Sequence, residues 1–137
     1  MSFSRSLRLF HGRTLTKFNK VRALAALDIF SSIIIATPVD KGPLRNNWFV
    51  SLNTAVGTAN PNDTGGGGQE KVNEITAKVE GYDDPFDDIL FINNLKYAGA
   101  IEYDGHSSQA PGGMVRVNTS RWDQVVRQAL RRVSYGD

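Results

Sequence analysis

The stretch that decides the fold covers residues 37–48 and reads TPVDKGPLRNNW. Pro38 disfavours helical geometry in the residue before it, so a helix that precedes this stretch must end at its first residue. Gly42 and Pro43 are typical of tight turns, and together with Pro38 they predict a rigid reversal of the chain. Trp48 begins the next segment and is expected to anchor it to the core. The residues expected to shape the turn are Pro38, Asp40, Gly42, Pro43 and Trp48.

A long helix is predicted before this turn, over residues 14–36. Apolar residues recur there at spacings of three and four, which is typical of a helix that packs on a core. Its apolar stripe consists of Leu15, Phe18, Val21, Ala25, Ile29 and Ile33. Asp28 lies off the stripe, whereas Arg22 lies close to it and is expected to extend its charged end into solvent. Residues 1–13 are expected to form a basic arm in front of the helix.

Two strands and one short helix are predicted after the turn. Residues 48–56 alternate between two faces, as in a half-buried strand, and residues 87–93 (DDILFIN) predict a second strand. Residues 69–80 favour a short helix between them. Its inward residues are expected to be Val72, Ile75, Ala77 and Val79.

The C-terminal segment has the clearest helical pattern. Its apolar stripe consists of Trp122, Val125, Val126, Ala129, Leu130 and Val133. Trp122, Val125, Ala129 and Leu130 are expected to be buried against the first helix or the sheet. Asn118 or Thr119 is expected to cap the start of the helix. The chain is therefore predicted to be one α+β domain, residues 1–137, with a small antiparallel sheet packed against a long N-terminal helix and a C-terminal helix.

Two long loops separate these elements. Residues 57–68 read GTANPNDTGGGG and are expected to be flexible, because glycine runs have the largest conformational entropy to lose. They do not form a phosphate-binding loop, since the Gly-Lys-Ser/Thr ending is absent. Residues 104–116 form a second long loop, and loops of this length inside a compact domain are usually functional or disordered.

No residue pattern indicates catalysis, a cofactor or a metal. The chain has no cysteine, and its two histidines, His11 and His106, lack metal-ligand spacing from a second strong ligand. The four aspartates of residues 83–88 do not follow the calcium-loop pattern and are expected to form a solvated turn. The longest charge-free apolar stretch, residues 29–39, is shorter than the about 20 residues that span a bilayer. We therefore expect a soluble protein that is not an enzyme and has no membrane partner.

Charge is strongly segregated along the chain, although the net charge is only +2. Residues 1–22 contain six basic residues and no acid, whereas residues 70–104 contain nine acids and three lysines. A basic end is either a solvated, mobile terminus, a nucleic-acid contact or a docking element for an acidic surface. We expect Arg5, Arg8 or Arg13 of one copy to lie near Asp83, Asp84, Asp87 or Asp88 of the next copy, or near an acidic neighbouring protein.

A second patch follows the second predicted strand. It contains INNLKYA at residues 92–98, IEYDGHS at 101–107 and QAPGGMVR at 109–116. Together with TPVDKGPLRNNW, and in the same order, these segments resemble the small head–tail connector and tail-completion proteins of long-tailed bacteriophages. The resemblance covers roughly residues 36–116 without the glycine loop. Lys41 replaces the threonine usual in the family, and Asp104 is inserted between Tyr103 and Gly105.

The resemblance implies a structural virion protein that completes the tail or joins it to the head. It implies a homo-oligomeric ring at the head–tail junction or the top of the tail, assembled in the host cytoplasm with other neck and tail proteins. A tail terminator or a head-side connector ring is the alternative, and a nucleic-acid-binding module that uses the basic arm is a weaker one. DNA would meet the ring only in passage through the neck. The candidate interaction residues are Arg5, Arg8, Arg13, Asp83, Asp84, Asp87, Asp88, Tyr97, Glu102, Tyr103, Gly105, His106, Pro111, Met114 and Arg116.

Overall fold

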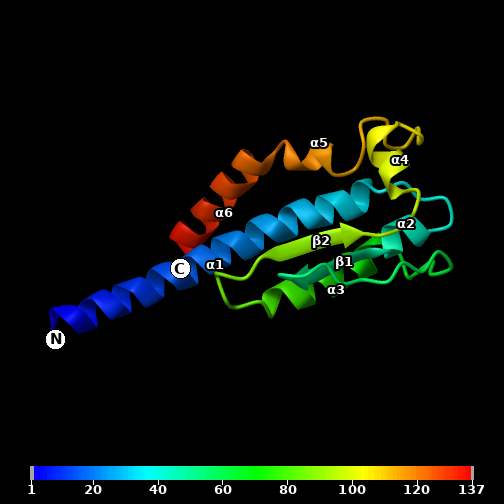
Figure 1. Ribbon diagram of the computed structural model, residues 1–137. Helices are drawn as coiled ribbons and strands as arrows, with labels where there is room; N and C mark the ends of the chain where they lie inside the picture. Colours follow the sequence, from blue (N-terminus) through cyan, green and yellow to red (C-terminus); the bar gives the residue numbers. More distant parts are fainter. Residues whose placement is uncertain (1, 137) are drawn as a thin grey trace.

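One long helix organises the domain. The computed structural model describes residues 2–136. Its elements in chain order are α1 (Phe3–Ala36), α2 (Pro43–Asn46), β1 (Trp48–Leu52), α3 (Gly68–Glu80), β2 (Ile89–Asn93), α4 (Ala98–Tyr103), α5 (Arg116–Thr119) and α6 (Trp122–Gly136). Helices α5 and α6 lie along one side of α1, and the sheet with α3 lies along the other side (Figure 1). This arrangement confirms the predicted α+β class.

Helix α1 begins eleven residues earlier than the sequence predicts. The side chain of Ser2 caps its start by accepting a hydrogen bond from the N–H of Arg5 at 3.2 Å. Residues 3–13, which were predicted to precede the helix as a basic arm, are therefore its first turns. No proline interrupts this segment, so the helical geometry of the apolar stripe continues back to the N-terminal cap.

The two strands pair antiparallel, as predicted, but both are shorter than their patterns suggest. Trp48 lies opposite Asn93 and Val50 lies opposite Phe91. The ring of Phe91 stacks between Trp48 and Phe30 of α1, with ring-centre distances of 4.5 Å and 4.2 Å. These contacts attach the sheet to α1.

Strand β1 ends at Leu52 because the chain turns at Asn53, which has a positive φ of 62°. The N–H of Asn53 donates to the carbonyl of Asp88 at 2.9 Å, and the side-chain oxygen of Asn53 accepts from the N–H of Asp88 at 2.8 Å. These two hydrogen bonds join the chains at the end of the sheet, next to Ile89, where β2 begins.

Helix α3 confirms the predicted helix but changes its buried face. Ile75 and Val79 are buried as predicted, Val72 is half-buried, and Ala77 is exposed, so that part of the prediction is wrong. The third buried residue is Lys71, whose ammonium group lies 2.9 Å from Glu74 and 5.6 Å from the ring centre of Phe49. These two contacts compensate the burial of its charge.

Helix α6 buries a narrower stripe than the sequence predicts. Val125, Ala129 and Val133 are buried, but Trp122 and Leu130 are nearly half exposed, so their predicted burial is wrong. The reason is that the main contact of α6 is with α1, and a single helix covers only a narrow seam.

The predicted caps of α6 also differ from the structure. The side-chain amide of Asn118 donates to the carbonyl of Met114 at 2.7 Å, and the hydroxyl of Thr119 donates to the carbonyl of Arg116 at 3.4 Å. Both bonds lie within the short helix α5, which the sequence pattern did not reveal.

The buried face of α1 can be tested by mutation. Ile33 is 2% exposed and Ile35 is 57% exposed on the same helix. Ile33→Ala should lower the free energy of unfolding by about 2–5 kcal/mol, because it removes packed apolar surface and leaves a cavity. The matched variant Ile35→Ala should change it by less than about 1 kcal/mol. Chemical denaturation followed by circular dichroism measures both, and equal effects would contradict the assignment of the buried face.

Candidate interaction surface

The C-terminal end of α1 is fixed by the turn that follows it. The hydroxyl of Thr37 donates to the carbonyl of Ile33 at 2.6 Å and accepts a hydrogen bond from the indole N–H of Trp48 at 2.9 Å. Thr37 and Trp48 are both buried. The tryptophan is thus anchored in the core, as predicted, and its polar edge is satisfied by the last turn of the helix.

Arg45 satisfies the free carbonyl groups of the same helix end. Its guanidinium group donates to the carbonyls of Ile34, Ile35 and Thr37 at 3.1, 3.0 and 3.1 Å. The last carbonyls of a helix have no partner within the helix, and a cation is favoured at that end. Arg45 was not among the predicted site residues, although it lies within the turn sequence.

Asn47 fastens the start of the glycine-rich loop to the turn. Its side chain is buried, donates to the carbonyl of Asn60 at 2.9 Å and accepts from the N–H of Asn60 at 2.7 Å. Further along the loop, the carbonyl of Thr64 lies against Gly42, where a Cβ atom would be only 2.6 Å away. Gly42 also has a φ of 102°, so both the space and the backbone require glycine.

The two sequence patches that carry the phage resemblance lie side by side. The N–H of Val39 donates to the side chain of Gln109 at 3.0 Å, and the amide of Gln109 donates back to the carbonyl of Val39 at 3.1 Å. The side chain of Asn93 donates to the carbonyl of Leu44 at 2.8 Å. Segments about seventy residues apart in the sequence therefore form one structural unit.

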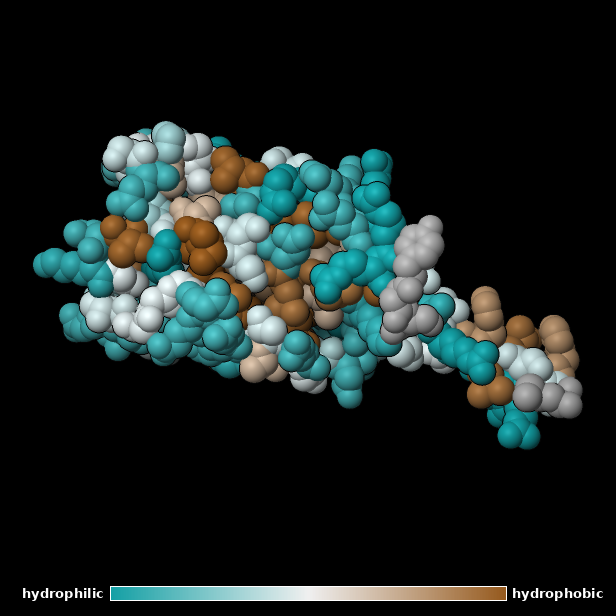
Figure 2. Space-filling view, turned by 180° about the vertical axis from the view of Figure 1, so that it is seen from behind, coloured by the Kyte–Doolittle hydropathy of each residue, from teal (hydrophilic) through white to brown (hydrophobic). Residues whose placement is uncertain are grey.

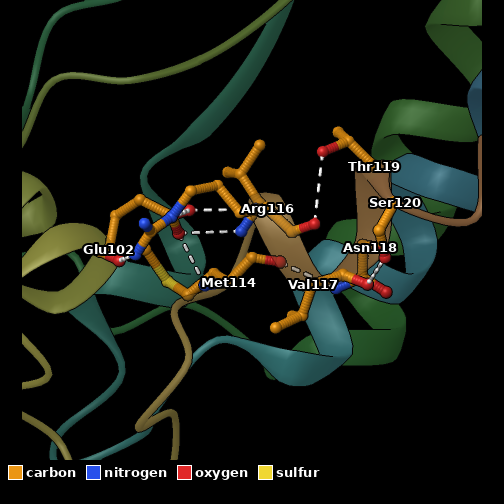
Figure 3. A network of polar contacts seen from close by, with 8 residues as sticks. Glu102, Met114, Arg116, Val117, Asn118, Thr119 and Ser120 are labelled. Atoms are coloured by element: carbon orange, nitrogen blue, oxygen red, sulfur yellow. Dashed lines mark hydrogen bonds and ion pairs between the residues drawn. The ribbon is translucent and has the colours of Figure 1, made fainter.

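Glu102 organises the second patch from within (Figure 3). Its carboxylate accepts hydrogen bonds from the N–H groups of Met114, Val115 and Arg116 at 2.6, 2.8 and 2.9 Å. The Nε atom of Arg116 adds a bond of 3.1 Å, and its guanidinium group also donates to the carbonyl of Glu102. Gly113 has a φ of 90° and leaves no room for a Cβ atom, which would lie 2.6 Å from that carbonyl.

The hydrogen bonds decide the charge state of Glu102. Burial acts to raise the pKa of its carboxyl, but the N–H groups of Val115, Arg116 and Met114 and the side chain of Arg116 outweigh burial and hold the pKa below its usual value. Glu102 is therefore an ionised internal ligand of the loop backbone. Met114 is completely buried beside it. Both were predicted as candidate interaction residues, and the structure places their side chains inside the subunit.

An open groove of about 490 Å³ lies where the two patches meet. Its walls are the turn residues 38–44, α4 and the loop residues 106–109. Tyr97 lies in this groove, where burial raises the pKa of its hydroxyl and the negative charge of Asp40 raises it further. The predicted residues that the structure brings together around the groove are Pro38, Asp40, Gly42, Pro43, Tyr97 and His106.

The remaining predicted residues of the second patch lie outside the groove. Tyr103 is exposed, and the guanidinium carbon of Arg116 lies 5.0 Å from its ring centre. Gly105 has a φ of 63°, and a Cβ atom there would lie 3.3 Å from the carbonyl of Pro111. Pro111 itself is exposed at the surface of the loop. These residues shape the rim of the second patch.

The predicted acidic turn, residues 83–88, is held against α1 through its backbone. Arg22 donates to the carbonyls of Asp84 and Pro85 at 2.8 and 3.1 Å and also to that of Asp87. The prediction that Arg22 extends into solvent is therefore wrong, because the turn supplies its hydrogen-bond acceptors. Nothing in the sequence of the turn indicates this contact.

Within residues 2–136, the structure contains neither a candidate metal site nor a candidate membrane-spanning helix. No group of three histidine or acidic side chains lies close enough to hold a metal ion. No helix in the described residues is long and apolar enough to cross a bilayer.

The Glu102 site predicts a specific pH dependence. Because its pKa is lowered by folding, the carboxylate contributes stability above its ordinary pKa and loses this contribution as the pH falls through the lowered folded value. Glu102→Gln should therefore lower the free energy of unfolding by about 1–3 kcal/mol at about pH 7. The difference from wild type should shrink below about pH 4.

Urea denaturation across this pH range measures the effect. The matched control is Asp104→Asn, an exposed acid two residues away, which should change the stability by less than about 0.5 kcal/mol at any pH. A deficit for Glu102→Gln that stays constant from neutral to acid pH would contradict the ionised, hydrogen-bonded state.

We compared the chain with models of protein families, with curated proteins and with solved structures, and none of them matches it.

Proposed function

We propose that the chain is a structural subunit of a tailed bacteriophage, located in the neck or at the top of the tail, where it completes the tail or joins it to the head. It acts as a homo-oligomeric ring and has no catalytic role. The observation that supports this proposal is the junction of the two patches that resemble head–tail connector and tail-completion proteins.

The hydrogen bonds of the two patches explain why an arginine, an asparagine and a glutamate stand at these positions. Arg45, Asn47 and Glu102 bind backbone groups at the ends of helices and in loops, with their partners at 2.6–3.1 Å. Buried polar side chains of this kind fix a backbone in one arrangement. A subunit that joins two large assemblies needs a rigid docking surface, because ordering a mobile one on binding would cost affinity.

The groove between the patches is the surface that fits a protein partner. It combines an aromatic side chain, Tyr97, with the polar groups of Asp40 and His106 and with backbone of the turn. Tyrosine is enriched among residues that dominate interface energies. A tail terminator and a head-side connector would use the same groove towards different neighbours, and these two positions are the alternatives within the proposal.

A nucleic-acid-binding module is the second candidate. The observation in its favour is that Arg5, Arg8, Arg13 and Lys17 are exposed on the end of α1 that extends beyond the body of the domain (Figure 1). Binding through this end would depend steeply on salt, because each neutralised phosphate releases counterions. Retention on DNA at about 0.15 M salt that is lost at about 0.5 M would favour this candidate.

The neck role predicts that the chain restores incomplete particles. In a phage from which the gene is deleted, tails and DNA-filled heads should accumulate separately, and adding the purified chain to such a lysate should produce infectious particles. Tyr97→Ala should lower this yield by about tenfold or more, because loss of one central aromatic contact costs about 1.4 kcal/mol or more. Plaque titre and electron microscopy of the joined particles provide the measurements.

The matched control is Gln128→Ala, an exposed position on α6 outside the groove, which should restore particles as well as wild type does. Circular dichroism should show both variants folded. Normal heads joined to normal tails in the absence of the chain would exclude the neck role.

A further inference from the structure

Residues 3–18 of α1 extend beyond the rest of the domain (Figure 1). All of these residues are exposed except Leu15, which is half-buried. At 1.5 Å per residue, the segment is a rod of about 24 Å. We call it the projecting segment.

The projecting segment has an apolar face that is left uncovered by the part of the chain that the structure describes. Phe3, Leu7, Phe10 and Phe18 recur at helical spacings, and Phe3 and Phe10 are 79% and 68% exposed. Apolar side chains gather on this end of the molecule in Figure 2. Large aromatic side chains offer about 150–250 Å² each, so the stripe has on the order of 500 Å² of apolar surface. Exposed patches of this size commonly mark interaction sites.

The basic residues of the segment are unevenly distributed around this apolar stripe. Arg13 lies three residues after Phe10, and Lys17 lies four residues after Arg13, so helical geometry puts both at one edge of the apolar face. By the same geometry Arg5 lies on the opposite side of the helix from Phe3 and Phe10. A partner that covers the stripe therefore meets Arg13 and Lys17 but not Arg5.

The acidic turn, residues 83–88, has the complementary chemistry. Phe86 is 77% exposed in the middle of four aspartates. Asn53 donates to the carboxylate of Asp87 at 2.9 Å, and the N–H of Phe86 donates to that of Asp84 at 2.9 Å. In the described part of the chain, the carboxylates of Asp83 and Asp88 have no such partner.

The basic edge of the projecting segment does not meet the acidic turn of its own copy. The turn is bound to α1 at Arg22, and Arg13 lies nine residues earlier on the same straight helix, about 13 Å away along the axis. Asn19 donates to the carbonyl of Tyr82 at 3.2 Å, so α1 contacts the turn from Asn19 onward. Lys17 lies five residues before Arg22, which puts it on the far side of the helix from the turn. Arg13 and Lys17 can therefore meet an equivalent turn only on another copy.

We propose that the projecting segment of one copy docks on the acidic turn of the next copy, with its apolar face against Phe86 and with Arg13 and Lys17 beside Asp83 and Asp88. The same contact repeats from copy to copy. Such a heterologous contact closes into a ring when its rotation closes. The inference deepens the proposed neck role by naming the ring contact, but it is tested on the purified chain alone, so its failure would leave the phage complementation test unaffected.

The test exchanges the two charge patterns. Arg13→Glu with Lys17→Glu reverses the segment, and Asp83→Lys with Asp88→Lys reverses the turn. Each double variant alone should self-associate about tenfold or more weakly than wild type at about 0.05 M salt, because attraction becomes repulsion. An equimolar mixture should regain wild-type association, since a reversed segment then meets a reversed turn and each native segment meets a native turn. Sedimentation equilibrium over a range of concentrations measures all of these species.

The controls separate this contact from general charge effects. Arg5→Glu should associate as wild type does, and Phe10→Ser should weaken association at both low and high salt, because it removes apolar area instead of charge. Circular dichroism should show unchanged helix content and melting in all variants. A wild-type chain that stays monomeric, reversed variants that associate normally, or a mixture that gains nothing would each overturn the proposal. Binding of the segment to DNA or to anionic vesicles without any self-association would also overturn it.

Discussion

The carbonyl groups at the end of α1 need hydrogen-bond partners, and satisfying them fixes the direction of the chain that follows. Arg45 takes three of these carbonyls, and the hydroxyl of Thr37 links the helix end to the indole of Trp48. Trp48 is the first residue of β1, so the same contacts set where the strand starts and which of its faces turns to α1. The stacking of Phe91 on Trp48 then brings β2 to that face. An unsatisfied buried polar group costs about 1–3 kcal/mol, which is a large part of the stability of a domain.

Glu102 performs the same task for the second half of the molecule. It binds three consecutive backbone N–H groups where the long loop enters α5, and Gly113 gives the loop the positive φ that this approach requires. A resemblance between sequences often suggests that the shared residues touch a partner. In this chain several of the shared residues hold the backbone instead, and the groove that they shape is the surface that we propose for a partner. Substitution of Arg45 or Glu102 should therefore destabilise the fold. Any effect on binding would follow from that loss of stability.

The sequence predicted those parts of the fold that depend on local chemistry. Pro38 and the Gly42-Pro43 pair predicted the end of the first helix and the reversal, and period-two and helical patterns predicted both strands and the buried residues Ile29, Ile33, Val125 and Ala129. Properties that depend on neighbours in space were not predictable. Trp122 and Leu130 belong to a full apolar stripe, but its main contact is with α1, which leaves both side chains nearly half exposed. Arg22 is half-buried because a turn sixty residues later supplies its acceptors. Glu102 and Met114 are buried by the same kind of long-range contact.

The helical extension of α1 has a consequence for how a subunit can be stable and still associate. The body of the domain has its own core, so residues 3–18 are free to serve a contact elsewhere without weakening the fold. Exposed ion pairs contribute only about 0–1 kcal/mol each, and therefore charge alone cannot hold a ring together. In the contact that we propose, the apolar face supplies most of the affinity, while the segregated charges favour one orientation and speed the encounter. Because charge attraction between exposed groups is screened by salt and apolar burial is not, salt should slow the formation of such a joint more than it weakens the finished contact.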